Sequence, residues 1–228
     1  MYTEKDNEIK KIKGLKWFPW IGHKYCTSRN KLMILGESYY LWEGEEGAYD
    51  ILNNREFTRE LVYNNHQGHL TDVNHIVKPL DSIERTLLNK KNLTIQEKIK
   101  ISNRYIYHVL VQKGLASIKE RPDYKSYYDG WKITVELLKT LKPKIVLVIG
   151  VESYTACVDY CTSAALLKHK KQEDFKINNT YPRTCKLTID NFDIDIIFLK
   201  HSSKYYSWEK WHEYISSKFN TDKVIANS

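Results

Sequence analysis

The sequence IVLVI at residues 145–149 is an unbroken apolar run that Gly150 closes. Such a run, rich in β-branched side chains, is typical of a strand at the centre of a parallel sheet that is covered on both faces. Residues 31–35 (KLMIL) repeat the pattern and are closed by Gly36. We therefore predict two buried strands, each ending at a glycine.

Helical patterns alternate with these strands along the chain. Thr94 and Glu97 form a capping box, which starts a helix that we expect to run to about Leu115. The alternation predicts an α/β protein, namely one domain over residues 1–228 that forms a three-layer α/β/α sandwich with a central, mostly parallel sheet. The other expected elements are helices over 48–63, after Asp129, over 154–167 and from Ser207, and strands over 186–190 and 194–199.

Composition excludes several classes of protein. The chain has 228 residues, of which 42% are hydrophobic and 13% aromatic, which is enough for a core and excludes long disorder. No stretch approaches the ~18 apolar residues of a membrane helix, and the charged N-terminus does not resemble a signal peptide. Four cysteines show no disulfide or zinc pattern. We expect a soluble, cytoplasmic, monomeric protein with reduced thiols and no membrane partner.

The net charge bears on the partner. Lys and Arg number 36 against 28 Asp and Glu, which gives a formal charge of +8. A basic protein with 17 Tyr and 6 Trp is suited to nucleic acid, because cations meet phosphates and aromatic faces stack on bases. A Lys-rich surface without such a partner explains the charge equally well.

Two strand ends carry unusual chemistry, at the edge of the sheet where ligands of such folds bind. The first is the segment Gly36–Tyr40 (GESYY), in which glycine permits a close approach, Glu37 can position water and the tyrosines can flank a flat ring. The second is the segment Lys200–Ser203 (KHSS), in which His201 can donate to a developing negative charge. A packed loop and a structural histidine cap are the alternatives.

Together these segments resemble the uracil-DNA glycosylase superfamily. Its first strand ends in a GQDPYH- or GEAPG-type loop, which the segment 36–40 resembles, and its later HPS- or HxS-type loop resembles the segment 200–203. Residues 141–150 are similar to its central L-x-P strand that ends at glycine, and residues 17–22 (WFPWIG) precede the first strand as in bacterial members. Residues 71–78 resemble the segment with the base-reading asparagine. The similarity spans about residues 17–211.

The resemblance implies a monofunctional DNA glycosylase, which cleaves the N-glycosidic bond of a flipped-out base and needs no metal or organic cofactor. DNA is then the partner. The implied catalytic residues are Glu37, which orients water or stabilises the sugar cation, and His201, which stabilises the departing base. The implied base-binding residues are Tyr39, Tyr40, Asn74 and His75, where one extra residue before Lys78 leaves Asn74 and His75 in competition. The implied DNA-binding residues are Ser38, Ser202, Ser203 and Lys204.

This chain differs from the family at the site itself. Ser38 stands where the family has its water-activating Asp or Asn, and Tyr39 replaces the following proline. These changes favour a damaged or modified base over uracil, for example a hypermodified phage base removed in antiviral defence.

Two other functions remain open. The loss of the carboxylate at Ser38 suits a non-catalytic nucleic-acid-binding module of the same fold. Alternatively Ser38 is the nucleophile of an esterase, although Asp195 lies six residues before His201 rather than three, and no G-x-S-x-G pattern surrounds Ser38.

Overall fold

The computed structural model describes residues 1–40, 53–67, 74–117, 119–202 and 205–219; the side chains of residues 67 and 74–77 lie outside the described part. Its centre is a seven-stranded sheet in the order β1-β3-β2-β4-β7-β6-β5. The strands are β1 (Trp20–Ile21), β2 (Leu32–Gly36), β3 (Tyr105–Val109), β4 (Ile145–Ile149), β5 (Leu167–Gln172), β6 (Arg183–Ile189) and β7 (Phe192–Leu199).

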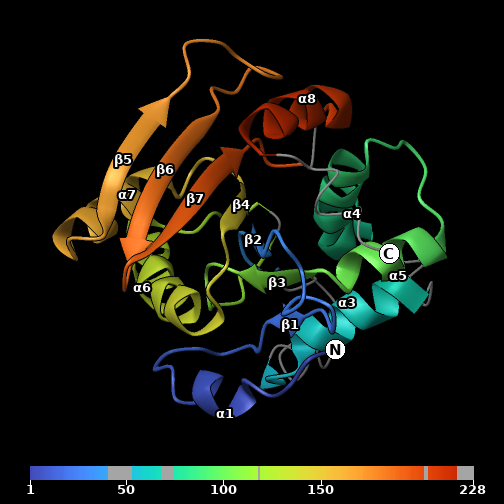
Figure 1. Ribbon diagram of the computed structural model, residues 1–228, viewed down its shortest axis with the longest axis horizontal. Helices are drawn as coiled ribbons and strands as arrows, with labels where there is room; N and C mark the ends of the chain where they lie inside the picture. Colours follow the sequence, from blue (N-terminus) through green and yellow to red (C-terminus); the bar gives the residue numbers. More distant parts are fainter. Residues whose placement is uncertain (41–52, 68–73, 118, 203–204, 220–228) are drawn as a thin grey trace.

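Helices cover both faces of this sheet (Figure 1). The helices are α1 (Asp6–Ile9), α3 (Phe57–Gln67), α4 (Asn74–Leu88), α5 (Ile95–Ser102), α6 (Tyr124–Leu141), α7 (Tyr154–Ser163) and α8 (Trp208–Lys218). One core packs α1, α6 and α7 against the sheet around Trp131 and Phe198. The other packs α3, α4, α5 and α8 around Trp17 and Trp211. The chain is therefore a mixed α/β structure with helices on both faces of its sheet, as predicted.

The four central strands run parallel. Residue Ile34 of β2 lies opposite Tyr107 of β3 and Leu147 of β4, and Ile149 of β4 lies opposite Leu199 of β7. This register brings the carboxyl ends of β2, β3, β4 and β7 to the same edge of the sheet. Loops that follow these four strands are the ones that can form a common site.

The outer strands make the sheet more mixed than predicted. β1 pairs with β3, β6 with β7 and β5 with β6, all antiparallel. The turn between β6 and β7 places Asp190 and Asn191 at positive φ, 48° and 62°, which is typical of a tight hairpin turn. A hairpin needs only a short turn, so these strands extend the parallel centre without crossover helices.

The predicted strands at 31–35 and 145–149, the capping box at Thr94 and the helix start at Ser207 agree with the structure. The strands expected over 186–190 and 194–199 are present as β6 and β7 with other bounds, and the helix expected over 154–167 ends at Ser163, with Leu167 already in β5. The predicted helix to Leu115 instead ends at Ser102, and residues 105–109 form β3. All five β3 residues are buried, because the strand lies between β1 and β2, and this burial outweighs the weak local preference for helix.

Other differences concern boundaries. Asp123 caps α6 through Ser126 N, so this helix begins before the predicted Asp129. Of the helix expected over 48–63, only the part from Phe57 onward lies in α3, and residues 48–52 lie outside the described range. The sequence analysis did not predict α1, β1, β5 or α4. Among the described residues, none of the helices has the length and apolar character needed to span a bilayer.

Candidate functional site

The two strand-end segments meet at the carboxyl edge of the sheet. Residues 36–40, which follow β2, and His201, which follows β7, line one cavity of about 40 Å³. Tyr107 of β3 and Ile149 of β4 complete its walls together with Pro79 of α4. The tertiary structure thus brings together Glu37 and His201, which the sequence analysis selected separately.

Backbone hydrogen bonds hold the first segment in place. The chain after β3 runs beside residues 36–40: Leu110 N donates to Gly36 O (2.9 Å), Val111 N to Glu37 O (2.9 Å) and Leu115 N to Tyr39 O (2.8 Å). A Cβ atom at Gly36 would lie 2.7 Å from the hydroxyl of Tyr107, so glycine is required for this close approach.

Glu37 is a buried carboxylate held by three donors. The Tyr127 hydroxyl donates to Oε1 (2.6 Å), while the Tyr40 hydroxyl (3.0 Å) and Arg121 Nη1 (3.1 Å) donate to Oε2. The side chain of Glu37 is only 5% exposed. A carboxylate offers about four lone-pair sites, so one site on Oε1 remains for a further donor such as water.

The tyrosines around Glu37 are hydrogen-bond donors. Burial raises the pKa of Tyr40 and that of Tyr127 far above the usual value, and the charge of Glu37 and the hydrogen bonds to it raise both further, so both phenols keep their protons. Burial likewise raises the pKa of Tyr107. The site therefore presents a fixed carboxylate among protonated phenols.

His201 is held as a neutral imidazole. Burial lowers its pKa below 6.5, and the cations Arg121 and Lys200 act in the same direction, against Glu37 and Glu152. Its Nδ1 is buried and has no hydrogen-bond partner among the described residues. A neutral ring has one N–H donor and one acceptor, and a ring without fixed partners can turn its donor toward a guest.

Gly150, at the end of β4, allows Glu152 to approach this ring. Its φ is +109°, a conformation that side chains rarely adopt, and a Cβ here would meet Glu152 Oε2 at 2.8 Å and His201 Cδ2 at 4.0 Å. Glu152 is thus a second carboxylate at the site, although its own side chain is exposed.

Sequence reasoning missed Arg121, Tyr127, Tyr107 and Glu152. None of them belongs to a short motif, and three lie on or after β3, the strand that was read as helix. Had β3 been predicted, its carboxyl end and the basic segment that follows would have been expected at the same edge as Glu37 and His201. Glu152 carried a comparable signal, because it lies two residues after the predicted glycine that closes β4.

Tyr39 and Ser38 have structural contacts. The Tyr39 ring packs edge-on against Trp17 and Phe57, at centroid distances of 5.1 and 4.8 Å, and its hydroxyl donates to Thr58 Oγ1 (2.9 Å). It forms a wall of the cavity, whereas Tyr40 contacts Glu37 directly. The Ser38 hydroxyl donates to the Lys113 carbonyl (2.8 Å), and no histidine or carboxylate partner is recorded for it in the described structure.

The other predicted residues are only partly described. Ser202 is buried, and its hydroxyl has no partner among the described residues. Asn74 and His75 begin α4, the helix whose Pro79 lines the cavity, but their side chains lie outside the described part, as do Ser203 and Lys204. Tyr205, which follows, is 87% exposed and has φ +52°.

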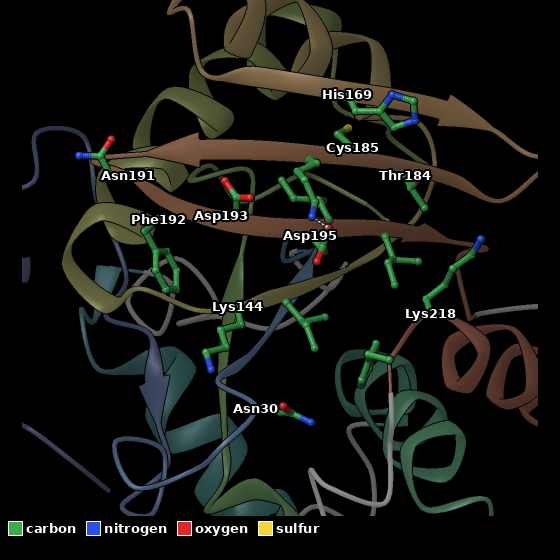
Figure 2. A pocket seen from close by; sticks show the side chains of 15 residues that line it. Asn30, Lys144, His169, Thr184, Cys185, Asn191, Phe192, Asp193, Asp195 and Lys218 are labelled. Carbon is green, nitrogen blue, oxygen red and sulfur yellow. Dashed lines mark ion pairs between the residues drawn. The ribbon is translucent and has the colours of Figure 1, made fainter.

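A larger hollow of about 940 Å³ lies elsewhere (Figure 2). It is lined by Lys144 and Asp193, near the start of β4 and β7, and it extends along β6 and β7 as far as Thr184 and Lys218 (Figure 2). An ion pair between Lys186 Nζ and Asp195 Oδ1 (3.3 Å) crosses it. None of the catalytic, base-binding or DNA-binding residues that the resemblance implies lines this hollow, which among the residues named above contains Asp195 of the esterase alternative. Size alone therefore does not mark the site here.

The described residues contain no group of three or more His, Cys, Asp or Glu side chains placed to hold a metal ion. Comparison of the sequence with protein-family models and with curated proteins finds no match to either.

Proposed function

We propose that this protein is a DNA glycosylase of the uracil-DNA glycosylase type, which hydrolyses the N-glycosidic bond of a flipped-out damaged or modified base. The observation that supports the proposal most is the convergence of Glu37 and His201 on one cavity at the carboxyl edge of the parallel strands. A buried carboxylate and a neutral imidazole are the two groups that this reaction needs. The resemblance of both loops to that superfamily supports the same conclusion.

The chemistry follows from the charges that develop. As the N-glycosidic bond breaks, its electron pair leaves with the base and the sugar becomes cationic. Glu37 stabilises this cation through its negative charge. With the free lone pair on its Oε1 atom, Glu37 also takes a proton from the water that adds to the sugar carbon. His201 donates a hydrogen bond to the departing base anion, which then takes its proton from solvent. The N-glycosidic bond breaks and a bond from the water oxygen to the sugar carbon forms, so the reaction needs no cofactor.

DNA fits the remaining features. The charge of +8 provides cations for phosphates, and Tyr205 presents an exposed aromatic ring beside the His201 segment. Ser38 and Tyr39, at positions where the superfamily has Asp or Asn and Pro, favour a modified base over uracil. A hypermodified phage base is the substrate class that we favour, with a role in antiviral defence.

The experiment is an abasic-site assay. Oligonucleotides that carry uracil, alkylated bases, hydroxymethylcytosine or glucosylated hydroxymethylcytosine are incubated with the protein, and abasic sites are cleaved with alkali and counted. We expect product with at least one modified base, and a loss of at least a hundredfold in Glu37→Gln and His201→Ala. Glu213→Gln, which changes an exposed carboxylate of α8, is the matched control and should keep full activity.

Other outcomes identify the alternatives. Salt-sensitive DNA binding without abasic product from any of these substrates would show a non-catalytic binding module. Activity that survives Glu37→Gln and His201→Ala but is lost in Ser38→Ala would contradict the assigned site. The esterase is disfavoured by the hydrogen bond from Ser38 to Lys113 O, which occupies the hydroxyl that would have to attack.

A further inference from the structure

Arg121 reaches the buried carboxylate of Glu37 from the solvent side. Its Nη1 donates to Glu37 Oε2 and to the Tyr40 hydroxyl, both at 3.1 Å. The side chain of Arg121 is 57% exposed, whereas that of Glu37 is 5% exposed. The cation can therefore move away without opening the core, while the carboxylate stays where Tyr127 holds it.

The contact between Arg121 and Glu37 conflicts with the chemistry proposed for the site. The inference drawn from this conflict rests on the proposed function. A carboxylate that stabilises a sugar cation or accepts a proton from water acts through its negative charge. A guanidinium beside it weakens that charge and occupies a lone pair. Arg121 must therefore be elsewhere when the reaction proceeds.

We propose that Arg121 is a positioning residue that restrains Glu37 and Tyr40 in the free protein and moves to a backbone phosphate when DNA binds. Only Nη1 is recorded in hydrogen bonds to described residues, so the rest of the guanidinium fork is available to a phosphate. The segment between β3 and α6 that carries Arg121 also carries the exposed Lys113 and Lys119, while its carboxylates Glu120 and Asp123 accept hydrogen bonds from Ala116 N and Ser126 N. Such a segment attracts a phosphate backbone.

The size of the cavity supports the same movement. About 40 Å³ is room for about one water molecule, which is less than a base requires. Tyr40 is one of the walls, and its hydroxyl is held by Arg121 and Glu37. When Arg121 leaves, Tyr40 loses one of these two contacts, and its ring can turn to admit the base.

The pH dependence of the reaction distinguishes a moving Arg121 from a fixed one. Among the described residues, the charged groups that act on His201 are Glu37, Arg121, Glu152 and Lys200. His201 acts as a neutral imidazole, and the charge of Arg121 disfavours its protonation. Removal of Arg121 therefore raises the pKa of His201 and moves the acidic limb of the rate profile, which the protonation of His201 sets, to higher pH.

The experiment compares the wild type, Arg121→Gln and Lys119→Gln, which removes a cation from the same segment. Rates of abasic-site formation are measured from pH 4.5 to 8, at subsaturating DNA for kcat/KM and at saturating DNA for kcat. The kcat/KM profile reports the free protein and the kcat profile reports the complex. In Arg121→Gln we expect the acidic limb of kcat/KM to shift by about half to one pH unit, while that of kcat stays in place. Lys119→Gln should shift neither limb.

Binding provides a readout that does not need turnover. We expect the slope of log Kd against log salt concentration to fall by about 1 in Arg121→Gln, as for the loss of one phosphate contact. An equal shift of both acidic limbs, or an unchanged salt slope, would overturn the movement of Arg121 while leaving the glycosylase intact. A wild type that forms no abasic product from any substrate would overturn the proposed function itself.

Discussion

Glu173 links α8, the helix that follows the His201 segment, to the chain after β5, and its replacement provides a test of the fold. The carboxylate accepts from Lys218 Nζ (2.7 Å) and the Tyr214 hydroxyl (3.1 Å) of α8, and it pairs with Lys171 Nζ (2.5 Å) of β5. Its side chain is only 4% exposed. We predict that Glu173→Gln destabilises the protein at neutral pH.

The size of the effect follows from the pKa of Glu173. Burial acts to raise this pKa, but the hydrogen bonds from Lys171, Lys218 and Tyr214 outweigh it and lower the pKa from 4.5 to about 2. A shift of this size corresponds to about 3 kcal/mol of folding free energy. Because the side chains of Lys171 and Lys218 are 54% and 35% exposed, solvent screens them, and we expect about 2 kcal/mol.

The direction of the pKa shift of Glu173 determines the pH range in which the carboxylate stabilises the protein. A carboxyl whose pKa is lower in the folded state stabilises the protein above pH 4.5, and this contribution is lost as the pH falls through about 2. Urea unfolding at pH 7, 5, 4 and 3 should show Glu173→Gln less stable than the wild type by a constant amount at pH 7 and 5. The difference should then shrink below pH 4.5. Glu213→Gln, on the same helix, should remain close to the wild type throughout. A difference at pH 3 as large as at pH 7, or none at pH 7, would refute this reasoning.

Three further predictions concern the site and its supports. Gly130→Ala should lower the free energy of unfolding by about 2 kcal/mol, because the new Cβ would lie 2.5 Å from the Leu110 carbonyl oxygen. This clash outweighs the better helix propensity of alanine. Thermal melting, with Lys132→Ala as the control, tests the prediction, and an unchanged melting temperature for Gly130→Ala would contradict it. Tyr127→Phe removes the 2.6 Å hydrogen bond to Glu37 and should reduce single-turnover abasic-site formation about tenfold or more, whereas Tyr128→Phe, whose hydroxyl lies 3.4 Å from Ser163, should not. Tyr205→Ala should weaken duplex binding about tenfold, as measured by fluorescence anisotropy, with Tyr63→Ala on the exposed face of α3 as the control; equal losses in both would indicate a general surface effect.

The sequence by itself determined the elements whose signals are local. The apolar runs at 31–35 and 145–149 form strands, because side chains of this kind are stable only when buried on both faces of a sheet. Thr94 and Ser207 start helices, because their hydroxyls accept from backbone donors three residues ahead. Glu37 and His201 were predicted as site residues for a related reason, since each directly follows or lies close to the end of a buried strand.

Only the tertiary structure decided which residues surround Glu37. The segment that forms β3 has no local pattern that separates it from a helix, and it becomes a strand because β1 and β2 offer it hydrogen bonds and burial on both sides. Once β3 is in place, the chain that follows brings Arg121 and Tyr127 to a carboxylate more than eighty residues earlier in the sequence. Hydrogen bonds over such separations depend on how the strands are ordered, and spacing along the chain does not encode that order.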